Sequence, residues 1–87
     1  MSKIYKYVIP IGKDSFYIPM PKDAKILKLE LQNGIPVFWA IVDINEESIL
    51  RKFVTIGTGW EMDDKNLSYI GTYPNDYFIW HIFEVIK

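Results

Sequence analysis

The pair Asn33-Gly34 lies between two apolar runs in the segment KILKLELQNGIPVFWAIVD, which spans residues 25–43. Both residues adopt a positive φ at little cost, so Asn-Gly between alternating apolar residues is the strongest short-range signal for a tight β-turn. The sequence therefore predicts a β-hairpin whose strands are Lys25–Gln32 and Ile35–Asp43.

The register of this hairpin depends on the length of its turn. A two-residue loop pairs Lys28 with Trp39. A three-residue loop, Gln32-Asn33-Gly34 with the glycine in a bulge, instead places Leu29 beside Val37. We favour the three-residue loop, because it collects the apolar residues on one side. A shift of one residue would move Trp39 to the opposite face of the sheet.

Five other segments have the composition of short strands and are separated by glycine, proline and polar turns. They are Ile4–Ile11, Phe16–Met20, Phe53–Ile56, Leu67–Tyr73 and Tyr77–Ile86. The first two are expected to form a hairpin, and Asp43–Lys52 is either a helical turn or a wide loop that carries Arg51 into solvent. The pattern predicts one all-β domain over residues 1–87. We expect a small antiparallel β-sandwich or barrel of about seven strands with at most one short helical turn.

Aromatic residues make up 16% of the 87 residues. A thin two-layer domain of this size cannot hide so many rings, so the surplus should form an oligomer interface or a site that stacks on a flat ligand. We favour the interface and therefore expect a homo-oligomer.

The charge distribution argues against a polyanion-binding protein. The formal net charge is −1 and the ten basic residues are scattered, so we expect no binding to duplex nucleic acid, although stacking on single strands stays open. The chain has no cysteine, which removes disulfides and thiolate chemistry and fits a reducing compartment. It shows no signal-peptide pattern and no apolar run long enough to span a membrane, which predicts a cytoplasmic protein.

The segment Gly57-Thr58-Gly59-Trp60 is the first candidate site. Two glycines at a strand end allow the backbone to approach a ligand closely and expose N–H donors, which suits a phosphate or carboxylate. The alternative is a glycine bulge that ends the strand, with Trp60 packed over the sheet edge. Trp60 is the best candidate for a functional tryptophan, whereas Trp80 is expected in the core and the position of Trp39 depends on the hairpin register.

His81 is the only histidine, so no multi-histidine metal site is expected. His81 and Glu84 are separated by an odd number of residues and should point to opposite faces of a strand, which excludes an acid–base pair between them. His81 is then either a half-buried, hydrogen-bonded sheet residue or a ligand contact. The acidic residues of the loops are interpreted as surface charges. No catalytic residue, metal or cofactor is expected, and we do not expect an enzyme.

Several segments taken together are similar to a known group of proteins. These are IYKY near the N-terminus, LQNGIPVFWAIVD, GTGW, YIGTY and HIFE. In this order the chain resembles a family of short uncharacterised tailed-phage accessory proteins, whose members often carry histidine where this chain has Trp60. The resemblance implies a phage accessory protein that works in the host cytoplasm during infection.

Small phage accessory proteins commonly act by binding, so the resemblance leads to two functional expectations. The first is a non-catalytic oligomer in counter-defence that sequesters a nucleotide-type immune signal. Its ligand would contact Arg51, the Gly57-Thr58-Gly59 loop and Trp60, with His81 and Trp39 as further contacts. The second is a protein-binding inhibitor of a host or defence enzyme, or a phage assembly component.

Overall fold

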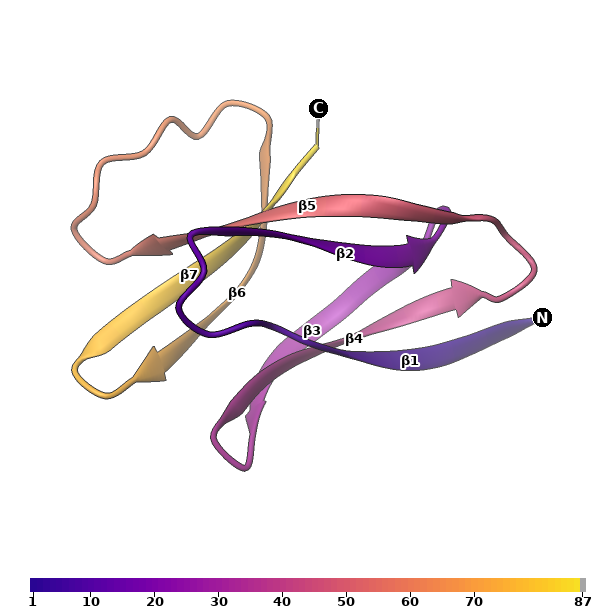
Figure 1. The fold of residues 1–87 in the computed structure, drawn as a ribbon, viewed down its shortest axis with the longest axis horizontal. Helices are drawn as coiled ribbons and strands as arrows, with labels where there is room; N and C mark the ends of the chain where they lie inside the picture. The colour runs from indigo at the N-terminus through magenta and orange to yellow at the C-terminus, as the bar shows by residue number, and fades with distance from the viewer. Residues whose placement is uncertain (87) are drawn as a thin grey trace.

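The computed structural model describes residues 1–86, and all of its regular structure is β-strand (Figure 1). The strands are β1 (Ser2–Val8), β2 (Ser15–Pro21), β3 (Lys25–Gln32), β4 (Ile35–Asp43), β5 (Ser48–Gly57), β6 (Leu67–Asn75) and β7 (Phe78–Val85). The prediction of an all-β fold with about seven antiparallel strands is confirmed. Both alternatives for Asp43–Lys52, a helical turn and a wide loop, are wrong, because a short turn there leads directly into β5 at Ser48.

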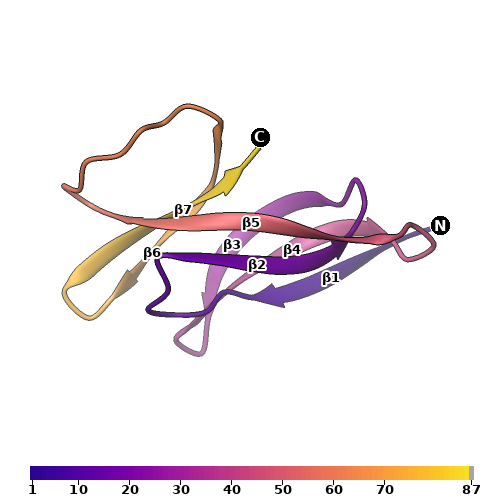
Figure 2. The same ribbon diagram turned by 45° about the horizontal axis from the view of Figure 1, so that its top comes forward.

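The strands form two antiparallel sheets that pack as a sandwich (Figures 1 and 2). One sheet has the order β1-β4-β3 and the other β2-β5-β7-β6. The expected hairpin of the first two strands is therefore wrong, since β1 and β2 belong to different sheets. The chain crosses between them in the segment from Ile9 to Asp14. It is held at both ends by the bonds from Ile9 N–H to the Pro36 carbonyl and from Thr55 N–H to the Asp14 carbonyl.

The β3–β4 hairpin has a two-residue turn, which corrects the three-residue loop that we favoured. Asn33 and Gly34 have φ of 52° and 79°, and Lys28 pairs with Trp39. Positive φ at both positions matches the twist of the flanking strands, which is why a two-residue turn forms here. The extra residue is Leu27, in a bulge farther along β3.

The core lies between the inner faces of the two sheets. Phe38 of β4 and Phe53 of β5 are fully buried, with ring centroids 5.6 Å apart, and Phe16 of β2 stacks on Phe53 at 5.5 Å. These contacts join the middle strands of both sheets. Burial of such large rings supplies most of the stabilisation available to a domain of this size.

The two sheets also approach closely where β3 lies beside β6. A β-carbon on Gly71 of β6 would be 2.6 Å from the β-carbon of Leu29 in β3. Because glycine has no side chain, the two strands can approach each other closely at this position. The sandwich is therefore tightest along the β3–β6 side.

Several aromatic rings remain on the surface of the described chain, as its composition predicted. The exposed ones include Tyr5, Tyr17, Trp60, Tyr69, Tyr77 and Phe78. No helix in residues 1–86 is long and apolar enough to cross a membrane.

Candidate ligand-binding site

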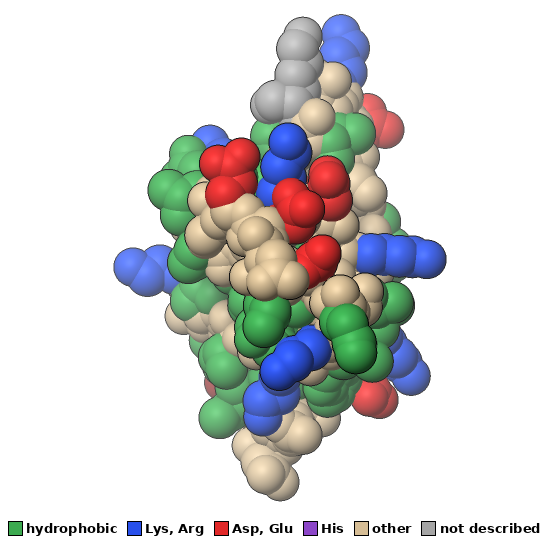
Figure 3. Space-filling view, turned by 90° about the vertical axis from the view of Figure 1, so that its right-hand side faces the viewer, with side chains coloured by type: hydrophobic (Ala, Val, Ile, Leu, Met, Phe, Trp, Pro, Cys, Tyr) green, Lys and Arg blue, Asp and Glu red, His purple; other side chains and the backbone are tan. Residues whose placement is uncertain are grey.

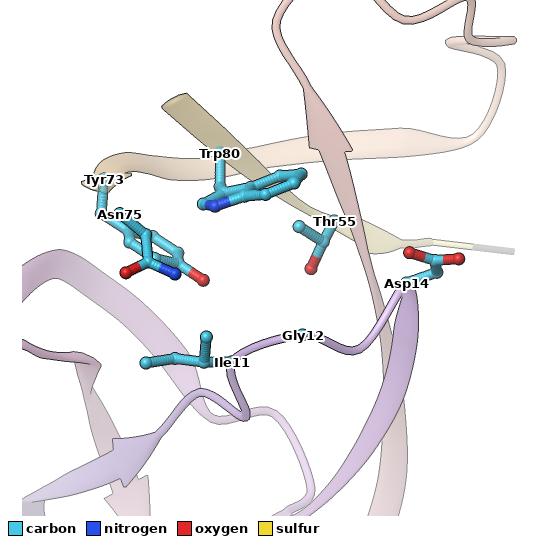
Figure 4. Close-up of a pocket in the computed structure, with 7 residues that line it drawn as sticks. All are labelled: Ile11, Gly12, Asp14, Thr55, Tyr73, Asn75 and Trp80. Carbon is cyan, nitrogen blue, oxygen red and sulfur yellow. The ribbon is translucent and has the colours of Figure 1, made fainter. Parts of the chain in front are cut away.

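A small cavity opens between the sheets at the end of the sandwich where the β1–β2 loop faces strands β5, β6 and β7 (Figure 4). We call it the aromatic cleft. Its volume is about 140 Å³, and it is lined by Ile11, Gly12, Asp14, Thr55, Tyr73, Asn75 and Trp80. Three strands of the four-stranded sheet and one crossing loop thus contribute to a single concave site.

Thr55 supplies the most unusual group in the cleft. Its side chain is on the inward face of β5 and is 9% exposed, and no protein group lies within hydrogen-bonding distance of its Oγ1. It is the only buried side-chain polar atom of residues 1–86 without a partner. A buried hydroxyl without a partner costs about 1–3 kcal/mol, so it needs an explanation. Figure 4 shows this hydroxyl pointing into the cleft.

Tyr73 and Asn75 place two further polar groups beside this hydroxyl. Both belong to β6, and their side chains end near each other in the cleft (Figure 4). Tyr73 is 2% exposed, and burial raises the pKa of its phenol above the ordinary value of 10.0. The phenol is protonated at neutral pH, as any tyrosine is, and can donate a hydrogen bond. The amide of Asn75 offers both a donor and an acceptor.

Aromatic rings form one wall of the cleft and continue outward from it. The indole of Trp80 stacks on Phe78 with ring centroids 5.3 Å apart, and meets Trp60 edge-on at 5.5 Å. Trp80 is half-buried and packs against the core, as predicted, whereas Phe78 and Trp60 are exposed. Trp60 is placed by the turn at Gly57, whose carbonyl accepts a hydrogen bond from the Trp60 N–H.

Arg51, which we expected to contact the ligand, does not line the cleft. Asp14 is the only charged residue that lines it within the described chain. Arg51 lies six residues before Gly57 along β5, a separation of roughly 20 Å in an extended strand. The structure therefore does not bring Arg51 to the glycine loop.

Arg51 is instead part of an interior ion pair. Its Nε and Nη2 donate to the two carboxylate oxygens of Glu84 at 2.5 and 2.7 Å, and its Nη1 donates to the Ala24 carbonyl. Both side chains are less than one-fifth exposed. The hydrogen bond with Glu84 raises the pKa of Arg51, which overcomes the opposing effect of burial. The alternative in which Arg51 reaches into solvent is therefore wrong.

At the end of the molecule where the N-terminus lies, acidic and basic side chains are interspersed on the surface (Figure 3).

His81 lies on the outer face of the four-stranded sheet, away from the cleft. Its Nε2 is 2.7 Å from the Thr58 hydroxyl, and its Nδ1 is 2.9 Å from the Thr72 hydroxyl, which in turn bonds to the Tyr69 phenol. A consistent arrangement has Thr72 donating to Nδ1 and Nε2–H donating to Thr58. The interpretation of His81 as a half-buried, hydrogen-bonded sheet residue is confirmed. Through these hydrogen bonds, His81 connects the Thr58 side chain to the outer face of the sheet.

With Arg51 in its interior ion pair, the predicted site residues thus separate into four places. Thr58 bonds to His81 on the outer face, while Trp60 packs on the inner face at the edge of the cleft. Trp39 lies on the outer face of the three-stranded sheet, in the same row of residues as Lys28. Only Trp60, with Gly57 beneath it, is near the cleft.

Sequence reasoning missed Thr55, Tyr73 and Asn75. Thr55 carried a signal, since it is a lone hydroxyl at an inward position between Phe53 and Gly57 in an apolar strand. Tyr73 was expected to end a strand, and Asn75 was expected in the turn after it. The structure continues β6 to Asn75 and places the turn at Asp76 and Tyr77, so both side chains point inward.

Fold and cleft together define a small two-sheet β domain with a cavity of about 140 Å³ at one end. The model of the family described as "Domain of unknown function (DUF7352)" matches residues 1–87, and the chain belongs to this family. Neither the search of the curated proteins nor that of the solved structures found a match.

Proposed function

We propose that this protein is a non-catalytic binding protein that holds a flat, nucleotide-type ligand in the aromatic cleft. The observation that carries the proposal is the unpartnered, buried hydroxyl of Thr55 in a cavity walled by Trp80 and Tyr73. Small-molecule sites have this composition, with apolar and aromatic walls and a few polar groups that orient the ligand. The Thr55 oxygen exposes less than 1 Å², so a ligand that bonds to it must displace a neighbouring group of the cleft. Such a bond would remove the cost of leaving the hydroxyl unsatisfied.

The arrangement of titratable groups supports binding rather than catalysis. Both ring nitrogens of His81 are engaged by threonine hydroxyls, and the ring is on the opposite face of the sheet from the cleft. A general base must reach the proton that it removes, either directly or through one water. Asp14 is the only carboxylate that lines the cleft in residues 1–86, and no imidazole accompanies it there.

The resemblance to short phage accessory proteins supplies the biological setting of the proposal. Made in quantity in the host cytoplasm during infection, a protein with such a site would lower the free concentration of a nucleotide-type immune signal. The surplus of exposed rings supports self-association into a homo-oligomer. Counter-defence by sequestration is the role that we propose for the chain.

Calorimetric titration with a panel of bases, nucleosides, cyclic oligonucleotides and ADP-ribose derivatives tests the proposal. We expect at least one member to bind, and Thr55→Val to weaken it while Thr72→Val, the same change on the outer face, does not. The Thr55 variant should fold, since valine removes an unsatisfied hydroxyl with little change of shape. A panel without any binding would overturn the proposal.

The outer face of the three-stranded sheet favours a second candidate function, that of a protein-binding inhibitor or assembly component. Ile4, Val8 and Ile35 are each about half exposed or more, and they lie on the same face as the half-buried Trp39. Apolar faces of this kind bind protein partners. For this function we expect Trp39→Lys to abolish stoichiometric recovery of a partner from host lysate, and Thr55→Val to leave that recovery unchanged.

A further inference from the structure

We propose that the aromatic cleft recognises an uncharged six-membered ring with a cyclic-amide edge, the chemistry of a pyrimidine base, and leaves any attached phosphate outside. This inference rests on the proposed function, because it names the part of a nucleotide-type ligand that the cleft holds. Three properties of the cleft carry it: its volume, the polar groups on one side, and its charge.

The volume admits one ring. A cavity of about 150 Å³ in another protein holds benzene, and the cleft measures about 140 Å³. A purine has two fused rings, and drug-sized ligands occupy pockets of at least about 300 Å³. The cleft is therefore matched to a single six-membered ring lying against the Trp80 indole.

The polar groups suit an amide edge. The Thr55 hydroxyl, the Tyr73 phenol and the Asn75 amide can each donate and accept a hydrogen bond. All three point into the same space from β5 and β6, the two strands on either side of β7 (Figure 4). A pyrimidine base such as uracil presents carbonyl oxygens and an N–H group alternately along one edge, which is the pattern that such a set of groups satisfies. A purely hydrocarbon ring would leave Thr55 unpartnered.

The charge of the cleft excludes a phosphate as the recognised group. No lysine or arginine lines it among residues 1–86, and its one charged residue, Asp14, would repel an anion. Arg51 is neutralised by Glu84 in the interior of the sandwich. Phosphates are bound by arginine, lysine or clusters of backbone N–H groups. A bound nucleotide would therefore place its base in the cleft and its phosphate in solvent, past the exposed rings of Trp60 and Phe78.

Titration with uracil, uridine, uridine monophosphate, adenosine and benzene tests this inference through the quenching of tryptophan fluorescence. We expect uracil and uridine to bind within about threefold of each other, the monophosphate to bind no tighter, and adenosine and benzene to bind at least roughly tenfold more weakly. Thr55→Val should weaken uridine roughly tenfold, the effect of one lost hydrogen bond, and Thr72→Val should not. Amide shifts on uridine binding should map to residues 54–56 and 72–75.

The outcomes separate this inference from the proposed function. A monophosphate that binds tenfold tighter than uridine, adenosine preferred over uridine, or uridine binding that Thr55→Val does not change would each overturn the pyrimidine assignment. In those cases the protein would still be a binding protein for flat ligands. Absence of binding by all five probes and by the wider panel would overturn both.

Discussion

The indole of Trp60 occupies the space that a side chain on Gly57 would need. A β-carbon on Gly57 would be 2.7 Å from Cε2 and 2.9 Å from Nε1 of Trp60. Real β-carbons do not approach other atoms so closely, so the glycine is what lets Trp60 fold back onto β5 beside Trp80. In the segment Gly57-Thr58-Gly59-Trp60, the role of Gly57 is therefore to make room for the Trp60 indole, rather than to present backbone N–H donors to a ligand.

Replacement of Gly57 by alanine tests this relationship. We expect Gly57→Ala to push the Trp60 ring outward and to lower the free energy of unfolding by about 1–3 kcal/mol, the usual effect of overpacking. Denaturant unfolding gives the stability, and the fluorescence of Trp60 in a Trp39→Phe, Trp80→Phe background gives its exposure. In a Trp60→Ala background the penalty of Gly57→Ala should largely disappear. An equal penalty in both backgrounds would contradict the steric account.

The network around His81 holds the same loop from the other face of the sheet. We expect His81→Ala to loosen Thr58 and to speed hydrogen exchange at the amides of residues 58–60, because the Thr58 hydroxyl loses the ring that it bonds to and keeps only its bonds to the Ile79 carbonyl. The stability loss should be about 0.5–1.5 kcal/mol for each bond. Thr72→Val removes one of the two bonds and should leave exchange at Thr58 nearly unchanged. Unaltered exchange in His81→Ala would contradict this function of the network.

The hairpin shows how far the sequence could predict the fold. The pair Asn33-Gly34 correctly predicted a turn and its two strands, because the tolerance of positive φ is a local property of those residues. The register of the two strands, in contrast, is not determined by the turn residues alone. The bulge at Leu27 lets Ile26 return to the core side opposite Ala40, and nothing in the alternation of β3 indicates where that bulge falls. The apolar pattern alone could not decide between turn lengths, since both collect leucines on one face.

The candidate site was predictable only in part, for a related reason. Trp60 and the glycine loop could be found, because aromatic and glycine residues in a turn are unusual in themselves. Thr55 and Tyr73 become a site only when β5 and β6 flank β7 in one sheet and the β1–β2 loop crosses above them. The non-consecutive neighbours in that sheet depend on long-range packing. Likewise, Arg51 was separated from the loop by a pairing with Glu84 across neighbouring strands.

The Arg51–Glu84 pair should be strongly coupled. Removing one partner leaves an interior charge uncompensated, so we expect Arg51→Met or Glu84→Leu to lower the free energy of unfolding by about 3–5 kcal/mol. The double replacement should recover most of this loss, because two apolar side chains then fill the same volume. Denaturant unfolding of the four proteins forms a double-mutant cycle. Additive effects of the two replacements would show that the pair is not coupled.

Two tyrosines should make the free energy of unfolding depend on pH in the alkaline range. Burial raises the pKa of Tyr7 and of Tyr73 above 10.0, so the folded chain keeps protons that the unfolded chain releases. This contribution to stability is complete below pH 10.0 and is lost as the pH rises through the raised folded-state pKa. We expect Tyr73→Phe to reduce the fall in unfolding free energy above pH 10.0, measured by denaturant titration. Tyr77→Phe, at a fully exposed position, should not change that fall, and an equal effect of both would contradict the assignment.

Self-association should depend on Trp39. It lies on the outer face of the three-stranded sheet between Lys6 and Lys28, where Lys6 also bonds to Gln32 at 2.7 Å across the face. Apolar residues on either side leave this face only partly covered, and a second copy of the chain would bury it. We expect light scattering to show an oligomer that Trp39→Lys converts to a monomer, with denaturant unfolding used to show that the variant is folded. Tyr77→Lys, at an isolated exposed tip, should leave the oligomer intact. A wild-type chain that stays monomeric at high concentration would show that the exposed rings serve another partner.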